Sequence, residues 1–241
     1  MNPIVIDISH WQASVDFKKV KDGGTVGVII KATQGTTSVD PTFIGRRQGA
    51  VSAGLLVASY HYLTKGSIAQ QMAFYVKTVA PSKGSRLVID FEDKGLTIGD
   101  LELAVKTLWE LAPDCEVTVY GANGFLGALL KGAKNDTLAK CSLWVASYTT
   151  ASKPTTADLN GTWPVWSLWQ YSQTGSVEGV KGDCDSNRWN GSPDSLPGWF
   201  HKALVPEPKP EPKPPSDVIV TVDIAAPEGV TLKVTINGKS L

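Results

Sequence analysis

The chain has 241 residues, of which 42% are hydrophobic and 19% charged, a composition that supports a buried core and excludes a disordered chain. Its 23 basic and 23 acidic side chains give a formal net charge of zero, so neither nucleic acid nor an anionic membrane is expected as a partner. No window approaches the ~20 consecutive apolar residues of a membrane helix, so no membrane insertion is expected.

The cysteines and histidines give no sign of a disulfide or metal site. The three cysteines lie far apart and form no C-x-x-C pair, which argues against a disulfide framework or structural zinc and indicates a reducing compartment. The three histidines match no metal-binding motif, and we expect neither a metal nor a cofactor. The opening residues, MNPIVIDISHWQ, have no basic region and their apolar run is interrupted at Asp7, so no signal peptide is expected.

Short apolar runs recur along most of the chain and predict buried strands. They occupy residues 4–6, 26–30, 55–58, 87–89, 117–120, 143–146 and 165–171. Continuous apolar runs of this length are typical of strands covered on both faces, as in a parallel sheet or barrel. Spacers long enough for crossover helices lie at residues 42–53, 68–79 and 98–111, whereas the gaps after Tyr120 are shorter and lose the helical pattern. The pattern predicts an α/β barrel, compact for its class, whose last strands are joined by loops.

Acidic residues follow several of these predicted strands, where a barrel of this class carries its site. Asp7 follows the first apolar run, Asp90 and Glu92 follow the fourth, and Asp185 lies in the predicted last loop. Residues i and i+2 of a strand point to the same side with Cα atoms ~6.6 Å apart, which brings the carboxyls of Asp90 and Glu92 together. Two such carboxyls cannot ionise independently, so one keeps a proton at neutral pH, as the general acid of a glycosidase must.

The chain is also rich in tryptophan. Four of its eight tryptophans lie at or near predicted strand ends: Trp11, Trp144, Trp166 and Trp169. Aromatic faces are common platforms for sugar rings, although ordinary core packing explains any single one of these side chains equally well.

Seven segments resemble, in the right order, the motifs of a known enzyme family. Residues 6–12 are similar to its opening D-x-S-x-x-Q motif, and residues 88–92 to its D-x-E motif. The other five are residues 28–35 (K-A-T-x-G), 58–62 (Y-H-aromatic), 143–148 (W-x-A-x-Y), 168–171 (W-Q-Y) and 184–191 (D-x-N-x-aromatic-x-G). Through them the chain resembles a family-25 glycoside hydrolase, an N-acetylmuramidase-type lysozyme of the phage endolysin kind, over about residues 4–191. The resemblance implies an incomplete TIM-like β/α barrel whose later strands lack helices.

The resemblance also implies roles for the four acids. Glu92 resembles the general acid, and Asp90 the residue that supports the substrate's N-acetyl group or a water molecule. Asp7 and Asp185 resemble the flanking carboxylates that position this pair, although the extra acid Asp183 leaves the last motif position open. The implied substrate-binding residues are Tyr60, Tyr62, Trp144, Tyr148, Trp169 and Gln170, with the choice between the first two tyrosines open. A retaining route through the substrate's acetamido group and an inverting route through water both remain open.

The implied function is hydrolysis of peptidoglycan at the β-1,4 bond between N-acetylmuramic acid and N-acetylglucosamine, with lysis of the bacterial cell. For an endolysin of a bacteriophage, we expect residence in the host cytoplasm until the membrane is disrupted, then antimicrobial action on the cell wall.

Two alternatives belong to other functional classes. One is a peptidoglycan-binding barrel without turnover, which would not need two costly adjacent acids. The other is an NAD-dependent dehydrogenase, because a strand is followed by G-x-x-G-x-x-G at residues 121–127. That motif lies in the middle of the chain rather than near its start, and the catalytic Tyr-x-x-x-Lys pair of such enzymes is missing.

The C-terminal part has a different composition. Residues 206–216, PEPKPEPKPPS, predict an extended polyproline linker, so we divide the chain into a catalytic barrel (1–205), the linker, and a β tail (217–241). Alternating apolar residues within 218–224 and 232–236 predict a small hairpin, which is marginal alone. We expect the tail to dock on the barrel, to self-associate into a homo-oligomer, or to bind the wall.

Overall fold

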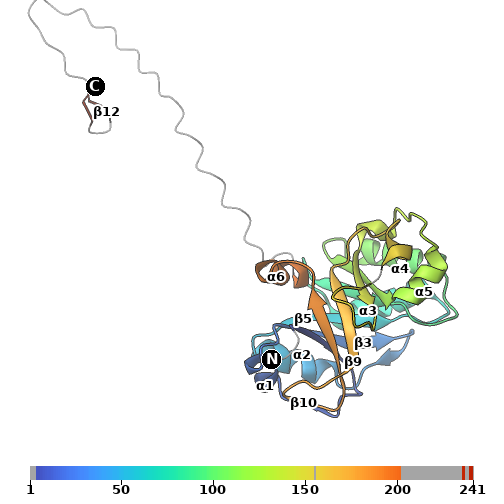
Figure 1. Cartoon of the computed structure of the whole chain (residues 1–241), viewed down its shortest axis with the longest axis horizontal. Coiled ribbons are helices and arrows are strands. Elements are labelled where there is room, and N and C mark those ends of the chain that lie inside the picture. Colours follow the sequence, from blue (N-terminus) through green and yellow to red (C-terminus); the bar gives the residue numbers. More distant parts are fainter. Residues whose placement is uncertain (1–3, 155, 202–234, 237–238, 241) are drawn as a thin grey trace, which may run out of the picture. The chain divides into compact units, whose positions relative to one another are not determined.

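The computed structural model describes residues 4–154, 156–201, 235–236 and 239–240, and it contains a closed barrel (Figure 1). The eight barrel strands are β1 (Val5–Ile8), β3 (Gly27–Gln34), β5 (Leu56–Tyr62), β6 (Arg86–Asp90), β7 (Glu116–Ala122), β8 (Ser142–Ala146), β9 (Leu168–Gly175) and β11 (Cys184–Trp189). Their order around the ring is β1-β11-β9-β8-β7-β6-β5-β3, and pairing of β1 with β3 closes it. Neighbouring strands are parallel, except that β11 runs antiparallel to both β1 and β9. The predicted α/β barrel is therefore confirmed.

Helices cover the first part of the barrel and become scarce towards its end. They are α1 (Phe17–Asp22), α2 (Phe43–Ser52), α3 (Ile68–Val79), α4 (Ile98–Leu111), α5 (Asn123–Leu130) and α6 (Leu196–Phe200), with single 3₁₀ turns at Leu138–Lys140, Ala157–Leu159 and Pro193–Ser195. Thr97 and Asp100 cap the start of α4 reciprocally, so this helix begins where the sequence predicts. Among the described residues, only a 3₁₀ turn lies between β8 and β9, and no helix lies between β9 and β11.

The glycine-rich segment after β7 corrects one prediction. The gaps after Tyr120 show no helical pattern and predict loops between the last strands, but α5 follows β7 directly as a helix whose glycines weaken its sequence signal. A Cβ atom on Gly121 would lie 3.0 Å from the Leu126 side chain, and one on Gly127 would lie 3.0 Å from Asp158. Close packing therefore explains Gly121 and Gly127 without a phosphate-binding turn, whereas a Cβ atom on Gly124 would meet nothing within 4 Å.

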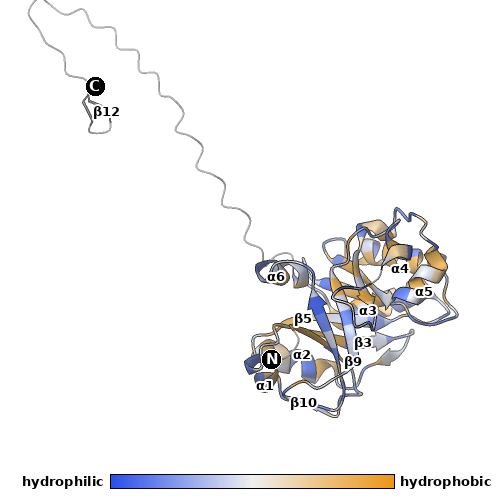
Figure 2. Ribbon diagram, viewed as in Figure 1, coloured by the Kyte–Doolittle hydropathy of each residue, from blue (hydrophilic) through white to orange (hydrophobic). Residues whose placement is uncertain are grey.

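Strand β11 corrects a second prediction, because Asp185 lies within this strand and not in a loop. The segment reads CDSNRW and has no apolar run, so it gave no strand signal. Figure 2 shows it as a hydrophilic strand, the one drawn in orange in Figure 1. Its backbone is nevertheless paired on both sides, by β1 and by β9.

Alternate strand residues face the two sides of the barrel wall, which explains the continuous apolar runs. On β1, for example, Val5 belongs to the cluster inside the barrel and Ile6 to the cluster between strands and helices. The inner cluster also contains residues of α6. Phe200 lies so close to Gly27 that a Cβ atom there would be 2.4 Å from its ring. Arg86 donates through Nε to the Trp199 carbonyl oxygen at 2.7 Å.

Gly27 and Arg86 are the first residues of β3 and β6, so α6 closes the N-terminal end of the barrel. The C-terminal ends of the parallel strands form the other end, which α6 leaves open.

Outside the barrel, β2 (Ser14–Val15) pairs with β10 (Val180–Lys181), and β4 (Ser38–Val39) pairs antiparallel with the end of β3. Strand β12 (Thr235–Ile236) pairs antiparallel with β13 (Lys239–Ser240). The predicted linker and the first strand of the predicted tail hairpin lie outside the described residues. Within the described residues, helices fall short of the length and apolar character that a membrane crossing requires.

Candidate active site

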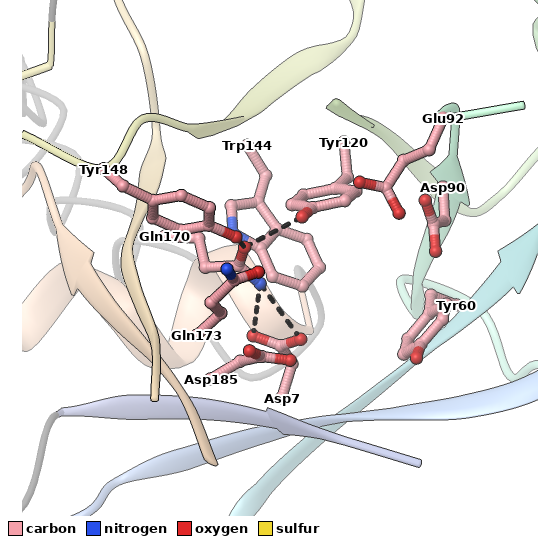
Figure 3. A pocket seen from close by; sticks show the side chains of 10 residues that line it. All are labelled: Asp7, Tyr60, Asp90, Glu92, Tyr120, Trp144, Tyr148, Gln170, Gln173 and Asp185. Carbon is pink, nitrogen blue, oxygen red and sulfur yellow. Dashed lines mark hydrogen bonds between the residues drawn. The ribbon is translucent and has the colours of Figure 1, made fainter. Parts of the chain in front are cut away.

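A cavity of about 150 Å³ opens at the C-terminal end of the barrel strands (Figure 3). The side chains that line it are Asp7, Tyr60, Asp90, Glu92, Tyr120, Trp144, Tyr148, Gln170, Gln173 and Asp185. The structure thus brings together all four predicted acids and four of the six predicted substrate-binding residues. Strand register explains this convergence, because Asp90 pairs with Tyr120 and Tyr120 with Trp144 in adjacent strands.

Two predicted substrate-binding residues do not line this cavity. Tyr62 is half-buried, with the Lys31 ammonium 4.9 Å from its ring centroid. Trp169 is buried in the cluster outside the barrel, where its Nε1 donates to the Ser147 carbonyl oxygen at 2.7 Å. Of the two tyrosines between which the sequence left the choice open, Tyr60 is the one that lines the cavity.

The first pair of acids, Asp90 and Glu92, lies at the end of β6. Asp90 is only 6% exposed, and its Oδ1 has no hydrogen-bond partner among the described residues. Burial and the neighbouring Glu92 charge raise the pKa of Asp90 well above its usual value. Burial also raises the pKa of Glu92, although the neighbouring Asp90, Tyr120 and Lys31 act to lower it. Burial thus favours the protonated form of both carboxyls, and Glu92 is the solvent-exposed member of the pair.

The second pair, Asp7 and Asp185, lies on adjacent antiparallel strands in direct register. Asn187 donates to Asp7 at 2.7 Å, and burial raises the pKa of Asp7 to about 6 despite this bond. Burial and the Asp7 charge raise the pKa of Asp185 to about 9. Asp183 is exposed, and its carbonyl oxygen accepts from Gln12 at 3.0 Å. Asp185, and not Asp183, is thus the acid that faces the cavity.

Gln170 connects the two sides of the cavity. Its Nε2 donates to both carboxylate oxygens of Asp7 at 3.1 and 3.2 Å. Its Oε1 accepts from the hydroxyls of Tyr120 at 2.8 Å and Tyr148 at 2.6 Å. Both lone-pair directions of this oxygen are therefore used within the protein, so the amide organises its neighbours and has little capacity left for a ligand.

Sequence reasoning missed two lining residues, Tyr120 and Gln173. Tyr120 ends a predicted apolar run, so the rule that located the acids could also have located it. Gln173 lies in the polar second half of β9, for which the sequence gave no signal.

The site thus combines an exposed carboxyl of raised pKa, a buried carboxyl beside it and a second acid pair, a set suited to general acid catalysis. In the part of the chain that the structure describes, His, Cys, Asp and Glu side chains form no group of three arranged to hold a metal ion.

Comparisons with known proteins agree with this geometry. The family model described as "Glycosyl hydrolases family 25" matches residues 6–180. Lysozyme M1 of Streptomyces globisporus is 31% identical over 203 residues, which cover 78% of this chain and 67% of that protein. The bacterial lysozyme structure from Streptomyces coelicolor superposes with a TM-score of 0.72 at 28% identity, covering 84% of this chain and 98% of its own. The CTP1L endolysin structure gives a TM-score of 0.67 at 25% identity, covering 82% and 69% of the two chains.

Proposed function

The chain belongs to glycosyl hydrolase family 25, and on this premise we propose that it is a lysozyme that cleaves the β-1,4 bond between N-acetylmuramic acid and N-acetylglucosamine in peptidoglycan. The observation that carries the proposal is the convergence of the adjacent carboxyls Asp90 and Glu92 with a second acid pair, Asp7 and Asp185, in one cavity at the open end of the barrel. A protein that only binds the wall has no need of four acids held together in this way. The packing role of Gly121 and Gly127 removes the basis of the dehydrogenase alternative.

In this reaction Glu92 donates its proton to the leaving glycosidic oxygen as the bond from that oxygen to the anomeric carbon breaks. The exposure of Glu92 to the cavity supports its role as donor. Asp90, with one oxygen unpartnered among the described residues, accepts a hydrogen bond from the substrate's acetamido N–H or from the attacking water. Water finally supplies a hydroxyl to the anomeric carbon, and its second proton returns to the acid pair. The retaining and the inverting course both fit this scheme.

Reducing-end analysis of digested peptidoglycan tests the proposal. New reducing ends of N-acetylmuramic acid are expected. Ends of N-acetylglucosamine would instead identify a glucosaminidase, and binding to peptidoglycan without new reducing ends would identify a barrel that has lost turnover.

We further propose that the protein is an endolysin of a bacteriophage with antimicrobial action, supported by its similarity to the CTP1L endolysin. It then resides in the cytoplasm of the host until the membrane is disrupted. Fractionation of producing cells before and after membrane permeabilisation tests this: lysis is expected only afterwards, and protein in the medium of cells with intact membranes would contradict it.

A further inference from the structure

Trp11 differs from the other tryptophans in its exposure. Its side chain is 80% exposed, the largest fraction among the exposed large apolar residues of the described chain. The remaining seven tryptophans are buried or half-buried. Since an exposed indole surface is unfavourable in water, this position calls for an explanation.

A buried arginine binds the backbone of the loop on either side of Trp11. Trp11 follows β1 and precedes β2, at the open end of the barrel. Arg46, which is 8% exposed, donates through Nη1 to the Ser9 carbonyl oxygen and through Nη2 to the Gln12 carbonyl oxygen. One guanidinium therefore fixes the backbone before and after Trp11.

Further contacts fix the neighbouring residues. The buried Asp40 carboxylate accepts from the backbone N–H of His10 at 3.0 Å and lies 2.8 Å from its ring Nδ1. The Gln12 side chain accepts from the backbone N–H of Ser9 at 2.8 Å. Because hydrogen bonds fix the residues on both sides of Trp11, its side chain is exposed from an ordered loop.

The same loop is joined to the active site. The Ser9 side chain lies near enough to the hydroxyl of Tyr60, which lines the cavity, to lower the pKa of that hydroxyl against the effect of burial. Gln12 donates to the carbonyl oxygen of Asp183, two residues before Asp185. The loop therefore borders the cavity near Tyr60, Asp7 and Asp185. In Figure 3, Asp7 and Asp185 lie apart from Asp90 and Glu92.

The indole has one face available for a ligand. The His10 ring packs against it with centroids 4.8 Å apart and planes tilted by 34°. A pyranose ring presents a face of C–H groups, which carry partial positive charge and suit the negative face of an aromatic ring. A glycan strand is much longer than a cavity of about 150 Å³, so rings beyond the cleaved bond must lie over its rim.

We infer that Trp11 is a stacking platform for a hexosamine ring of the glycan strand, outside the cavity and on the Asp7–Asp185 side. The inference rests on the proposed function for the identity of the polymer. It assigns Trp11 to substrate binding, and it assigns Arg46 and Asp40 to positioning the loop.

Binding and turnover measurements on the full chain separate the two proposals. The probe is peptide-free glycan strands prepared from peptidoglycan and separated by length. In a Glu92→Gln background, in which cleavage is expected to be slow enough for binding to be measured, Trp11→Ala is expected to weaken binding of long strands about tenfold, and Trp11→Phe about threefold or less. Leu103→Ala, an exposed apolar position on α4, serves as the matched control without effect.

In the active enzyme, Trp11→Ala is expected to raise KM for long strands more than it lowers kcat and to abolish the preference for long over short strands. Equal binding by Glu92→Gln with and without Trp11→Ala would overturn the platform, while reducing-end analysis of the wild type still decides the proposed function. Failure of the Glu92→Gln protein to bind any strand, together with an absence of new reducing ends from the wild type, would overturn both proposals.

Discussion

Asp183 and Asp185 are two residues apart and chemically identical, yet their surroundings differ. Asp185 faces the cavity beside Asp7, and its pKa is raised to about 9. Asp183 is exposed on the surface. Asp183→Asn is therefore a matched control for any change made at Asp185.

We predict that Asp185→Asn stabilises the protein at alkaline pH. The pKa of Asp185 is raised from 3.8 to about 9 on folding, so between these values the folded state binds more protons and stability falls as pH rises. An amide cannot ionise and is not subject to this loss. At pH 8 the variant should gain at least about 1 kcal/mol, or ~2–4 °C in Tm, with little difference at pH 4.

Thermal unfolding at the two pH values measures this effect. Asp183→Asn should leave Tm unchanged at both. A Tm of Asp185→Asn that is equal to the wild type at pH 8 would show that the carboxyl is ionised there without cost. Activity should fall in the Asp185 variant, because the site loses one member of its second acid pair.

We predict that Glu92→Gln lowers kcat by about 10²–10⁴-fold, the usual contribution of a general acid. The amide retains the shape of the side chain but has no transferable proton, so Tm should not fall. Glu110→Gln, an exposed position on α4, is the control. Near-normal turnover of Glu92→Gln would remove Glu92 from the role of general acid.

At the scale of elements, Gln170 on β9 links β1, β7 and the residues after β8 through one amide. The pKa of Asp7, raised by burial to about 6, is held down by donors that include this amide. We predict that Gln170→Met raises the pKa of Asp7 further, because the ionised form loses a donor. If turnover needs ionised Asp7, the acidic limb of the kcat/KM profile then moves to higher pH.

The pH profile of kcat/KM is the measurement, with Gln70→Met on the exposed face of α3 as control. An unshifted acidic limb in Gln170→Met would mean that this amide does not control the charge of Asp7.

The contact of α6 with β3 gives a stability prediction. Gly27→Ala forces a Cβ atom against the Phe200 ring and should destabilise the protein by about 1–3 kcal/mol, as overpacking does. Gly45→Ala on α2 meets nothing within 4 Å and should stabilise by about 0.5–1 kcal/mol through helix propensity. Chemical denaturation measures both. Recovery in Gly27→Ala/Phe200→Leu would attribute the loss to this contact, whereas an unaltered single variant would contradict it.

The sequence predicted elements well wherever burial on both faces left an apolar run. The helices at Ile68–Val79 and Ile98–Leu111 have their predicted bounds. Strand β11 was missed because it has no apolar run: Asp185 lines the cavity and Asn187 donates to Asp7. Its pairing with β1 also depends on residues far away in sequence. Helix α5 gave no helical periodicity in the sequence because it is short and contains two glycines, of which Gly127 packs closely against Asp158.

The same reasoning explains what was predictable in the site. Asp90 and Glu92 follow an apolar strand two residues apart, so local spacing sufficed to pair them. The pairing of Asp7 with Asp185, and the two hydrogen bonds that occupy the Gln170 side-chain oxygen, arise from contacts between residues that are far apart in sequence. Spacing along the chain carries no information about such contacts.

At the scale of the whole molecule, we predict that deleting residues 206–241 leaves hydrolysis of soluble muropeptide fragments intact. All ten residues that line the cavity belong to the barrel. We expect the predicted tail instead to promote self-association or contact with the wall. Because its loss removes multivalent attachment, lysis of whole cells, or the apparent molecular mass measured by light scattering, should fall. A truncated protein that equals the full chain in both would show the tail to be inert, and lost turnover of soluble fragments would make it part of the barrel.

The position of β1 between β3 and β11 has a consequence for how the protein is made. Val5 and Asn187 are 182 residues apart in sequence but bonded across neighbouring strands. During synthesis, one edge of β1 stays unpaired until β11 has left the ribosome. Such an exposed strand edge can pair with other chains and lead to aggregation. Contacts of such long range also slow folding. A chain that is interrupted before residue 184 has an open sheet in place of a ring, so only nearly complete synthesis yields an enzyme.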